Sequence, residues 1–278
     1  MNSPKILVVI GHGLYEPWLN ILHEGQRKTW LRWPVPENMK IIHMHGTPLS
    51  KVGWKIDRIH ERIRWKNVWV AKPLEYIDRI VTLPFRAYIP KIQKSKLLVL
   101  EQEVIQVKFP DSYLNMVWKN LALWRYFISK TDYDFLFFTT TSSLIKPFAL
   151  SELISRFDPN DSIYAGVRPY KGANFAAGNN RLLSRPAAQL LLDKRLLLDP
   201  AIIEDKGIGL AFERLGVSFI ELPSLNITSV DETKSPDFTN KLNANFHIRV
   251  KSGTFTNRDD VELMNIVYSK LNALGGPI

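Results

Sequence analysis

Hydroxyl-bearing side chains form an unbroken run at residues 139–143, Thr-Thr-Thr-Ser-Ser. The run follows the largely apolar residues 134–138, which we interpret as a buried β-strand. Ligands of open α/β sheets bind outside the carboxyl ends of the strands, so this turn is a candidate ligand contact. The alternative is that its hydroxyls cap a helix predicted to begin at Pro147. Neutral hydroxyls are poor ligands for a hard divalent cation, so we expect no metal at this turn.

Two further segments carry charge in patterns that could serve an anionic ligand. If residues 246–251 are extended, alternation places His247, Arg249 and Lys251 on one side. One cation–phosphate pair at about 4 Å, with an effective dielectric constant near 20, is worth roughly 4 kcal/mol before desolvation. A basic strand facing solvent is the alternative. The second segment is the pair Glu204 and Asp205, which begins a predicted helix and would also suit the helix dipole.

Two sets of polar residues could add to a site at the ends of the strands. One set recurs every fourth residue and would share a helix face: Asp111, Asn115 and Lys119. Its lysine could reach a phosphate, and its aspartate is also a candidate helix cap. The other set lies near two predicted strand ends: His12, His43 and His45. These imidazoles could contact a ligand, and their spacing is not diagnostic of zinc.

Strand-like and helix-like segments alternate along the chain. The predicted strands cover residues 5–13, 40–45, 96–105 and 134–138. The predicted helices cover residues 18–30, 112–129, 147–157, 186–192 and 204–215, and residues 228–243 are predicted to form a polar loop that could act as a lid. The pattern predicts an α/β fold with a mostly parallel sheet and helices on both faces. Gly11 and His12 follow the first strand, without the second half of a dinucleotide-binding fingerprint.

Composition limits the classes of protein that the chain can belong to. Its 278 residues contain no cysteine, which excludes disulfides, thiolate metal sites and thiol nucleophiles. The amino terminus lacks a signal-peptide core, so we expect a cytoplasmic protein that is soluble or peripherally membrane-associated. Residues 51–96 carry twelve Lys or Arg and four acidic residues, a balance of +8 within a total of +10. This segment could contact an anionic membrane surface, or it could be a solvated helix face; a nucleic-acid partner is not expected.

Four blocks, in order, resemble glycosyltransferase family 31, the Fringe and β1,3-galactosyl- or N-acetylglucosaminyltransferase family. Residues 26–30, Gln-Arg-Lys-Thr-Trp, resemble its Ile-Arg-x-Thr-Trp motif, and residues 109–119 resemble its Phe-x-Asp-x-Tyr-x-Asn-Leu-Thr-x-Lys motif. Residues 174–185, which contain Gly178, resemble its Gly-x-x-Tyr-x-Leu-Ser segment. Residues 204–209, Glu-Asp-Lys-Gly-Ile-Gly, resemble its Glu-Asp-Val-x-x-Gly motif. The basic segment at residues 51–96 lies outside the resemblance.

The resemblance implies a GT-A fold and inverting transfer of a sugar from a UDP-sugar donor to a hydroxyl of a glycan acceptor. Galactose, xylose and N-acetylglucosamine are the candidate sugars. One domain over residues 1–278 is expected, with a nucleotide-binding half at residues 1–145 and an acceptor half at residues 146–278. Asp205 becomes the candidate general base and Glu204 the residue that positions it. Arg27 becomes a candidate nucleotide contact, although a surface salt bridge is the alternative.

The departure from the family pattern falls on the hydroxyl run. The family's Asp-x-Asp, which holds Mn²⁺ against the diphosphate, would align with Thr140-Thr141-Ser142. His247 would correspond to the carboxy-terminal His of that metal site. We therefore expect transfer without a cofactor, with Mn²⁺ not favoured and with cations taking its place. The full set of donor-binding candidates is Gly11, His12, Arg27, Asp111, Asn115, Lys119, Thr140, Thr141, Ser142, Gly178, His247, Arg249 and Lys251.

Two other functions remain compatible with the sequence. The first is a catalytically inactive GT-A domain that binds glycan or nucleotide without turnover. The second is a basic protein that binds nucleic acid or a membrane surface through its cationic segment.

Overall fold

The computed structural model describes residues 3–50, 53, 55, 91–95, 103–112, 115–199, 202–253 and 258–276. Most of the basic segment at residues 51–96 therefore lies outside the described residues, and with it both alternatives for that segment, contact with an anionic membrane surface and a solvated helix face. In the part of the chain that is described, no helix is both long enough and apolar enough to cross a bilayer.

The described strands form one large mixed sheet, in the order β3-β4-β2-β1-β5-β8-β7-β9. Its centre is parallel and consists of β4 (Val104–Pro110), β2 (Met39–Thr47), β1 (Ile6–Gly11) and β5 (Phe135–Thr140). Antiparallel pairings add β3 (Ile92–Ser95) at one side, and β8 (Asn180–Ser184) and β7 (Tyr164–Gly166) at the other. The outer strand β9 (Phe219–Glu221) runs parallel to β7.

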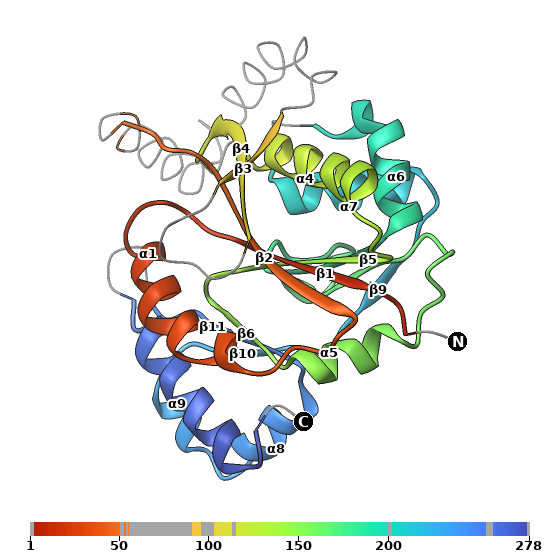
Figure 1. Cartoon of the computed structure of the whole chain (residues 1–278). Helices are drawn as coiled ribbons and strands as arrows, with labels where there is room; N and C mark the ends of the chain where they lie inside the picture. Colours follow the sequence, from red (N-terminus) through yellow and green to blue (C-terminus); the bar gives the residue numbers. More distant parts are fainter. Residues whose placement is uncertain are drawn as a thin grey trace.

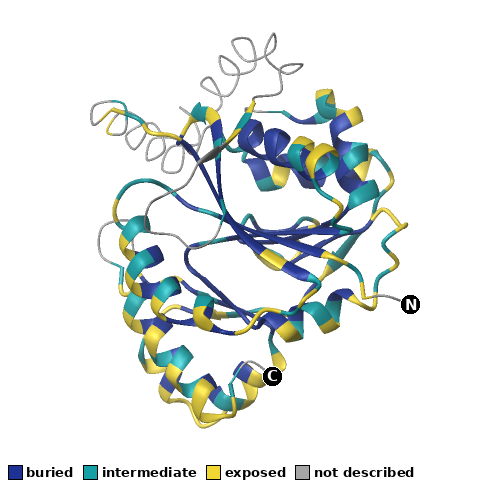
Figure 2. Ribbon diagram, in the orientation of Figure 1, coloured by how far each residue is buried: buried dark blue, intermediate teal, exposed yellow. Residues whose placement is uncertain are grey.

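Both faces of the sheet are buried, and β1 shows how the sequence achieves this. Ile6, Val8 and Ile10 point into one hydrophobic cluster, whereas Leu7 and Val9 point into another. A strand covered on both faces needs a nearly continuous apolar sequence, which β1 and the first four residues of β5 have. In Figure 2 the central strands are coloured as buried throughout most of their length.

Helices cover the sheet on both sides (Figure 1). One layer contains α4 (Met116–Lys130), α6 (Arg185–Asp193) and α7 (Glu204–Arg214). The other contains α5 (Pro147–Ile154), α8 (Phe238–Ala244) and α9 (Asp260–Ala273). The α/β class, with a mostly parallel sheet between helices, is thus confirmed.

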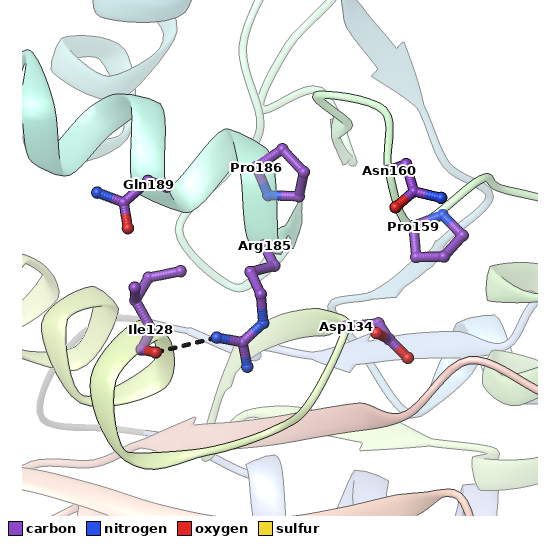
Figure 3. Close-up of a pocket in the computed structure, with 7 residues that line it drawn as sticks. All are labelled: Ile128, Asp134, Pro159, Asn160, Arg185, Pro186 and Gln189. Carbon is purple, nitrogen blue, oxygen red and sulfur yellow. Dashed lines mark hydrogen bonds between the residues drawn. The ribbon is translucent and has the colours of Figure 1, made fainter.

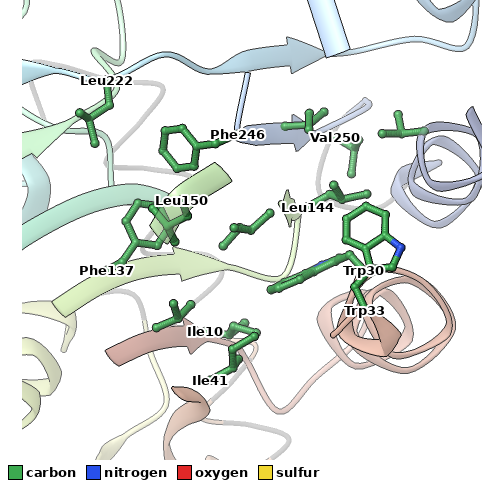
Figure 4. Packing of buried hydrophobic residues seen from close by; sticks show 14 of the residues in the cluster. Ile10, Trp30, Trp33, Ile41, Phe137, Leu144, Leu150, Leu222, Phe246 and Val250 are labelled. Atoms are coloured by element: carbon green, nitrogen blue, oxygen red, sulfur yellow. The ribbon is translucent and has the colours of Figure 1, made fainter. Parts of the chain in front are cut away.

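A second, small sheet lies in the layer with α8 and α9. It is formed by β10 (Leu225–Ile227), β11 (His247–Val250) and β6 (Ser143–Ile145), in that order. Phe137 of β5 meets Phe246 edge to face, with ring centroids 5.8 Å apart. Figure 4 shows these rings with Leu144, Trp30 and Val250 in one packed cluster. The small sheet therefore fixes residues 143–145, which begin with the last residue of the hydroxyl run, against the main sheet.

Four predicted elements differ from the structure. The helix predicted at residues 18–30 is α1 (Trp18–Asn20) followed by a π-helical turn and two 3₁₀ turns, because Gly25 leaves the helical region and Thr29 Oγ1 donates to its carbonyl. The third strand, predicted at residues 96–105, is seen as β4 from Val104 to Pro110, and residues 96–102 of the prediction lie outside the described residues. The helix predicted from residue 112 begins at Met116. The loop predicted at residues 228–243 contains most of α8, which Phe238 and Leu242 anchor in the core.

Candidate functional site

Strand register brings three residues together at the carboxyl edge of the parallel strands. Gly11 at the end of β1 pairs with Met44 of β2 and with Thr140 of β5. All three line a pocket of about 490 Å³, a size within the usual range for small-molecule sites. The pocket thus lies where ligands of open α/β sheets bind.

Most candidate residues from the sequence line this pocket: Gly11, His12, Asp111, Lys119, Thr140, Ser142, Gly178, Glu204, Asp205, Arg249 and Lys251. Four others do not line it: Arg27, Asn115, Thr141 and His247. The pocket wall also contains residues that the sequence interpretation did not select, among them Tyr15, Trp18, Asn179 and Arg258.

The hydroxyl run at residues 139–143 spans the end of β5, a turn at 141–142 and the start of β6. Three of its hydroxyls have separate partners, whereas Thr141 Oγ1 has none among the described residues. Thr139 Oγ1 donates to the carbonyl of Asn179 at 2.9 Å, and Ser142 Oγ accepts from Arg258 Nη2 at 2.6 Å. Ser143 Oγ lies 3.0 Å from His247 Nε2. None of them caps a helix, because α5 begins after Lys146 and has no side-chain cap. The capping alternative is therefore wrong, and Thr140 and Ser142 face the pocket.

The segment at residues 26–30 supports the hydroxyl run through hydrogen bonds to its backbone. Gln26 is fully buried, and its Nε2 donates to the carbonyls of Thr140 at 3.1 Å and Ser143 at 2.9 Å. Trp30 packs in the core. Arg27 lies half-buried outside the pocket wall. Within this motif, Gln26 is therefore the residue that supports the site, by donating to the backbone carbonyls of Thr140 and Ser143.

His247 is a buried hydrogen-bonding residue of the small sheet. Its Nδ1 lies 2.7 Å from Ser224 Oγ, and its Nε2 contacts Ser143. Burial, together with the charge of Arg249, lowers the pKa of His247 to about 3. The ring is therefore neutral at physiological pH, and both nitrogens are occupied.

These residues do not fit the Mn²⁺ site that the family resemblance implies. A hard divalent cation prefers carboxylate oxygens, and Thr140 and Ser142 supply hydroxyls. His247 has both ring nitrogens in hydrogen bonds. Within the described ranges, no three or more His, Asp or Glu side chains are grouped so that they could hold a metal ion.

Asp111 ties together three segments around the pocket. Its Oδ2 accepts from the backbone N–H of Leu14 at 2.9 Å, and its Oδ1 accepts from that of Gly46 at 3.1 Å and from Lys119 Nζ at 3.0 Å. Burial opposes ionisation of Asp111, but Lys119 and the two N–H groups outweigh it and lower its pKa. Because α4 begins after Asn115, the expected single helix face is wrong, although the Asp111–Lys119 contact forms.

Glu204 and Asp205 have different environments in the first turn of α7. Glu204 is buried, forms an ion pair with Arg181 Nη1, and accepts from Asn120 Nδ2 at 2.5 Å. Burial raises the pKa of Glu204, and Arg181 opposes that shift. Asp205 is half-buried in the pocket wall and has no ion pair with any described residue. The pair therefore divides into an anchored carboxylate and an accessible one, and both remain compatible with the helix dipole.

The three histidines near the strand ends pack together, with His12 in the pocket wall. The His12 ring centroid lies 5.7 Å from that of His43 and 5.3 Å from that of His45. Burial and the two neighbouring imidazoles lower the pKa of His12 to about 3, so this ring is neutral. His12 Nε2 makes no hydrogen bond with a described residue. The zinc alternative gains no support, since the described residues contain no metal-binding group of this kind.

Arg258 is the main charged residue that the sequence interpretation missed. It precedes α9, forms an ion pair with Asp260, and lies with its guanidinium carbon 6.0 Å from the centroid of the Trp18 ring. The triplet Arg-Asp-Asp at residues 258–260 resembles an ordinary helix start. Only the fold reveals that Arg258 reaches Ser142.

A second hollow, of about 380 Å³, lies beside the start of α6 (Figure 3). Arg185 dominates it, but its guanidinium donates to the carbonyls of Ile128, Thr131 and Tyr133. These bonds satisfy groups at and beyond the end of α4. The arginine thus has a structural role, and the pocket at the strand ends is the candidate site.

No protein-family model matches the sequence, and no curated protein matches it. Solved structures similar to this chain include a glycosyltransferase involved in glycosylation of the major capsid of PBCV-1, with 10% identity, a TM-score of 0.48, and coverage of 94% of this chain and 100% of that one. The galactosyltransferase LgtC has 10% identity, a TM-score of 0.46 and coverage of 95% of each chain. Mouse xyloside xylosyltransferase 1 has 9% identity, a TM-score of 0.41, and coverage of 88% of this chain and 97% of that one. All three TM-scores are below 0.5, so the function of this chain has to be inferred from its own residues.

Proposed function

We propose that this protein is a glycosyltransferase that moves a sugar from a UDP-sugar donor to a glycan hydroxyl without a divalent metal. The observation that carries the proposal is the composition of the pocket at the strand ends. One accessible carboxylate, Asp205, shares that pocket with Lys119, Arg249, Lys251 and the hydroxyls of the turn. The proposal includes a GT-A-like fold, and galactose, xylose and N-acetylglucosamine remain the candidate sugars.

The cationic side chains would stabilise the departing diphosphate. As the bond between the anomeric carbon and the diphosphate oxygen breaks, negative charge grows on the leaving group. Preorganised positive charge at that position lowers the barrier, the role that a divalent ion has in metal-dependent enzymes. Arg249 and Lys251 lie at the end of β11 and in the pocket wall, which suits this role.

Asp205 would act as the general base. The acceptor hydroxyl attacks the anomeric carbon from the face opposite the diphosphate, which inverts the configuration there. The proton of that hydroxyl passes to the Asp205 carboxylate, and the electron pair of the broken bond leaves with the diphosphate. Glu204 would position the first turn of α7 through its contacts with Arg181 and Asn120.

Substitution Asp205→Asn tests the base. We expect sugar transfer to fall by about 10²–10⁴-fold, the usual contribution of general base catalysis. UDP affinity, measured by isothermal titration calorimetry, should change by no more than a few-fold. Glu213→Gln is the matched control, because Glu213 is an exposed acid on the same helix. Turnover close to wild type in Asp205→Asn would eliminate Asp205 as the base.

Metal independence is tested by thermal unfolding with UDP-sugars in EDTA and in Mn²⁺. We expect the matching donor to raise Tm in EDTA, because ligand binding to the folded state stabilises it. A donor that raises Tm only when Mn²⁺ is added would refute a metal-free site.

An inactive sugar-nucleotide-binding domain is the second candidate, and the hydroxyls in place of metal-binding carboxylates favour it. It predicts UDP binding without transfer or hydrolysis in either EDTA or Mn²⁺. Binding to a membrane surface or nucleic acid through residues 51–96 predicts instead a steep dependence on salt and no affinity for UDP.

A further inference from the structure

The guanidinium of Arg258 is held along one edge. Its Nε donates to Asp260 Oδ1 at 3.2 Å, and its Nη2 contacts Asp260 Oδ2. Nη2 also donates to Ser142 Oγ at 2.6 Å. The Arg258 side chain is 5% exposed and that of Asp260 is 0% exposed. The arginine is therefore fixed in a low-dielectric wall of the pocket, with little freedom to move.

Asp260 is itself fixed, so the orientation of the arginine is set by the backbone around it. Asp260 Oδ1 accepts from the backbone N–H of Ser252 at 3.1 Å. Ser252 Oγ in turn accepts from the backbone N–H of Asp259 at 2.5 Å. These bonds connect the segment after β11 to the start of α9. Arg258 is thus positioned relative to Arg249 and Lys251, which precede Ser252.

The opposite edge of the guanidinium has donors left over. An arginine has five N–H donors, of which Nε supplies one and each Nη supplies two. Nε and Nη2 serve Asp260 and Ser142, whereas Nη1 forms no hydrogen bond with any residue that the structure describes. Ser142 also uses its oxygen only as an acceptor toward Arg258, and its own hydrogen is committed to no described residue. Both residues line the pocket.

We propose that Arg258 binds the anionic group of the pocket's ligand, with Asp260 and Ser142 as positioning residues. The ligand chemistry is a diphosphate, because planar arginine donors suit phosphate oxygens and the same wall adds Arg249 and Lys251. The identity of this diphosphate as that of a sugar nucleotide rests on the proposed function. Arg258 contacts the hydroxyl at the third position of Thr140-Thr141-Ser142, where the family resemblance expects a metal-binding carboxylate, so an arginine takes the position of the cation.

Inorganic pyrophosphate, UDP and uridine are the probes, with affinities measured by isothermal titration calorimetry at low salt. Arg258→Lys keeps the charge but loses the planar donor edge. It should weaken pyrophosphate and UDP binding at least tenfold and leave uridine binding within about twofold, as expected for loss of a charge-assisted hydrogen bond. Arg185→Lys is the matched control: it disturbs an arginine outside the pocket and should leave all three affinities unchanged.

Loss of the buried pair could also unfold the chain, so a second variant is needed. Ser142→Ala removes one positioning contact and leaves the Arg258–Asp260 pair intact. It should lower the ratio of UDP to uridine affinity several-fold, a ratio that a general loss of stability would not shift. If the ratio is unchanged in Ser142→Ala, and also in Arg258→Lys wherever that variant folds, the role of Arg258 is refuted.

Failure of this inference can be separated from failure of the proposed function. Arginine-dependent pyrophosphate binding by a protein that transfers no sugar would keep the anion site and reject the transferase. If the protein transfers sugar and Arg258→Lys leaves the KM for the donor unchanged, the transferase is kept and the anion-binding role of Arg258 is rejected.

Discussion

His247 should make the stability of the fold sensitive to mild acid. Its folded-state pKa is about 3, whereas an unperturbed histidine has a pKa near 6.5. Above pH 6.5 the ring is neutral in both the folded and the unfolded chain. As pH falls below 6.5 the unfolded chain binds a proton that the folded chain rejects. The folded state therefore loses stability as the pH is lowered, and the loss continues until about pH 3.

The magnitude follows from the difference between the two pKa values. Each pH unit below 6.5 costs about 1.4 kcal/mol, so at pH 5 His247 alone lowers the free energy of unfolding by about 2 kcal/mol. His12, whose pKa is also about 3, contributes a similar loss. Glu204 acts in the opposite direction, because its raised pKa favours the folded state as pH falls. The lowered pKa of Asp111 matters only below about pH 4.

Urea unfolding at pH 7.5 and pH 5 measures this effect, and a substitution isolates one histidine. His247→Asn should be less stable at both pH values, but its decrease between them should be smaller than that of wild type by about 2 kcal/mol. Phe246→Leu is the control, because it disturbs the same core cluster and leaves the histidine in place. An equal decrease in wild type and His247→Asn would refute a buried neutral His247 as the source of acid sensitivity.

Two further substitutions test the supports of the pocket. Gly46→Ala should lower the free energy of unfolding, measured in urea, by about 1–3 kcal/mol, because a Cβ there would lie 2.6 Å from the Cα of Asp111. Gly207→Ala is the control: its Cβ would have its nearest neighbour at 3.6 Å, so the free energy of unfolding should not fall. Gln26→Leu should cost about 1–3 kcal/mol by the same measurement, since two carbonyls of the hydroxyl turn lose their donor. A neutral result for either variant would contradict the contacts described for it.

The sequence predicts the sheet and the edge that carries the site because both follow from local patterns. Apolar runs such as that of β1 mark strands buried on both faces. Parallel strands place their carboxyl ends at one edge, so Gly11 and Thr140 are expected at the same edge; that β1 and β5 are neighbours, and these residues therefore pair, is seen only in the structure. This reasoning needs no knowledge of side-chain packing.

The roles of single residues in a motif depend on packing, which the sequence does not display. In the motif at residues 26–30 the charged Arg27 attracted the prediction, yet the buried Gln26 makes the contacts with the turn. His247 was selected as a polar member of an alternating strand, yet it is buried within the small sheet, and each ring nitrogen has a serine partner. Only tertiary structure decides which side of β11 meets the pocket.

Arg258 and a carboxylate at position 142 would compete with each other. A carboxylate there would lie within reach of Nη2, which now donates to Ser142 Oγ at 2.6 Å. It would form an ion pair with Arg258 and be a poorer ligand for a divalent cation, because its charge would already be neutralised. Asp260 would then share Arg258 with a second carboxylate while its own side chain stays buried, and a buried carboxylate that is only partly paired lowers the stability of the fold. A hydroxyl at Ser142 therefore lets Arg258 stay in the pocket wall with its Nη1 donors available to a ligand. The absence of an acid from the turn and the presence of Arg258 are thus two parts of one electrostatic arrangement.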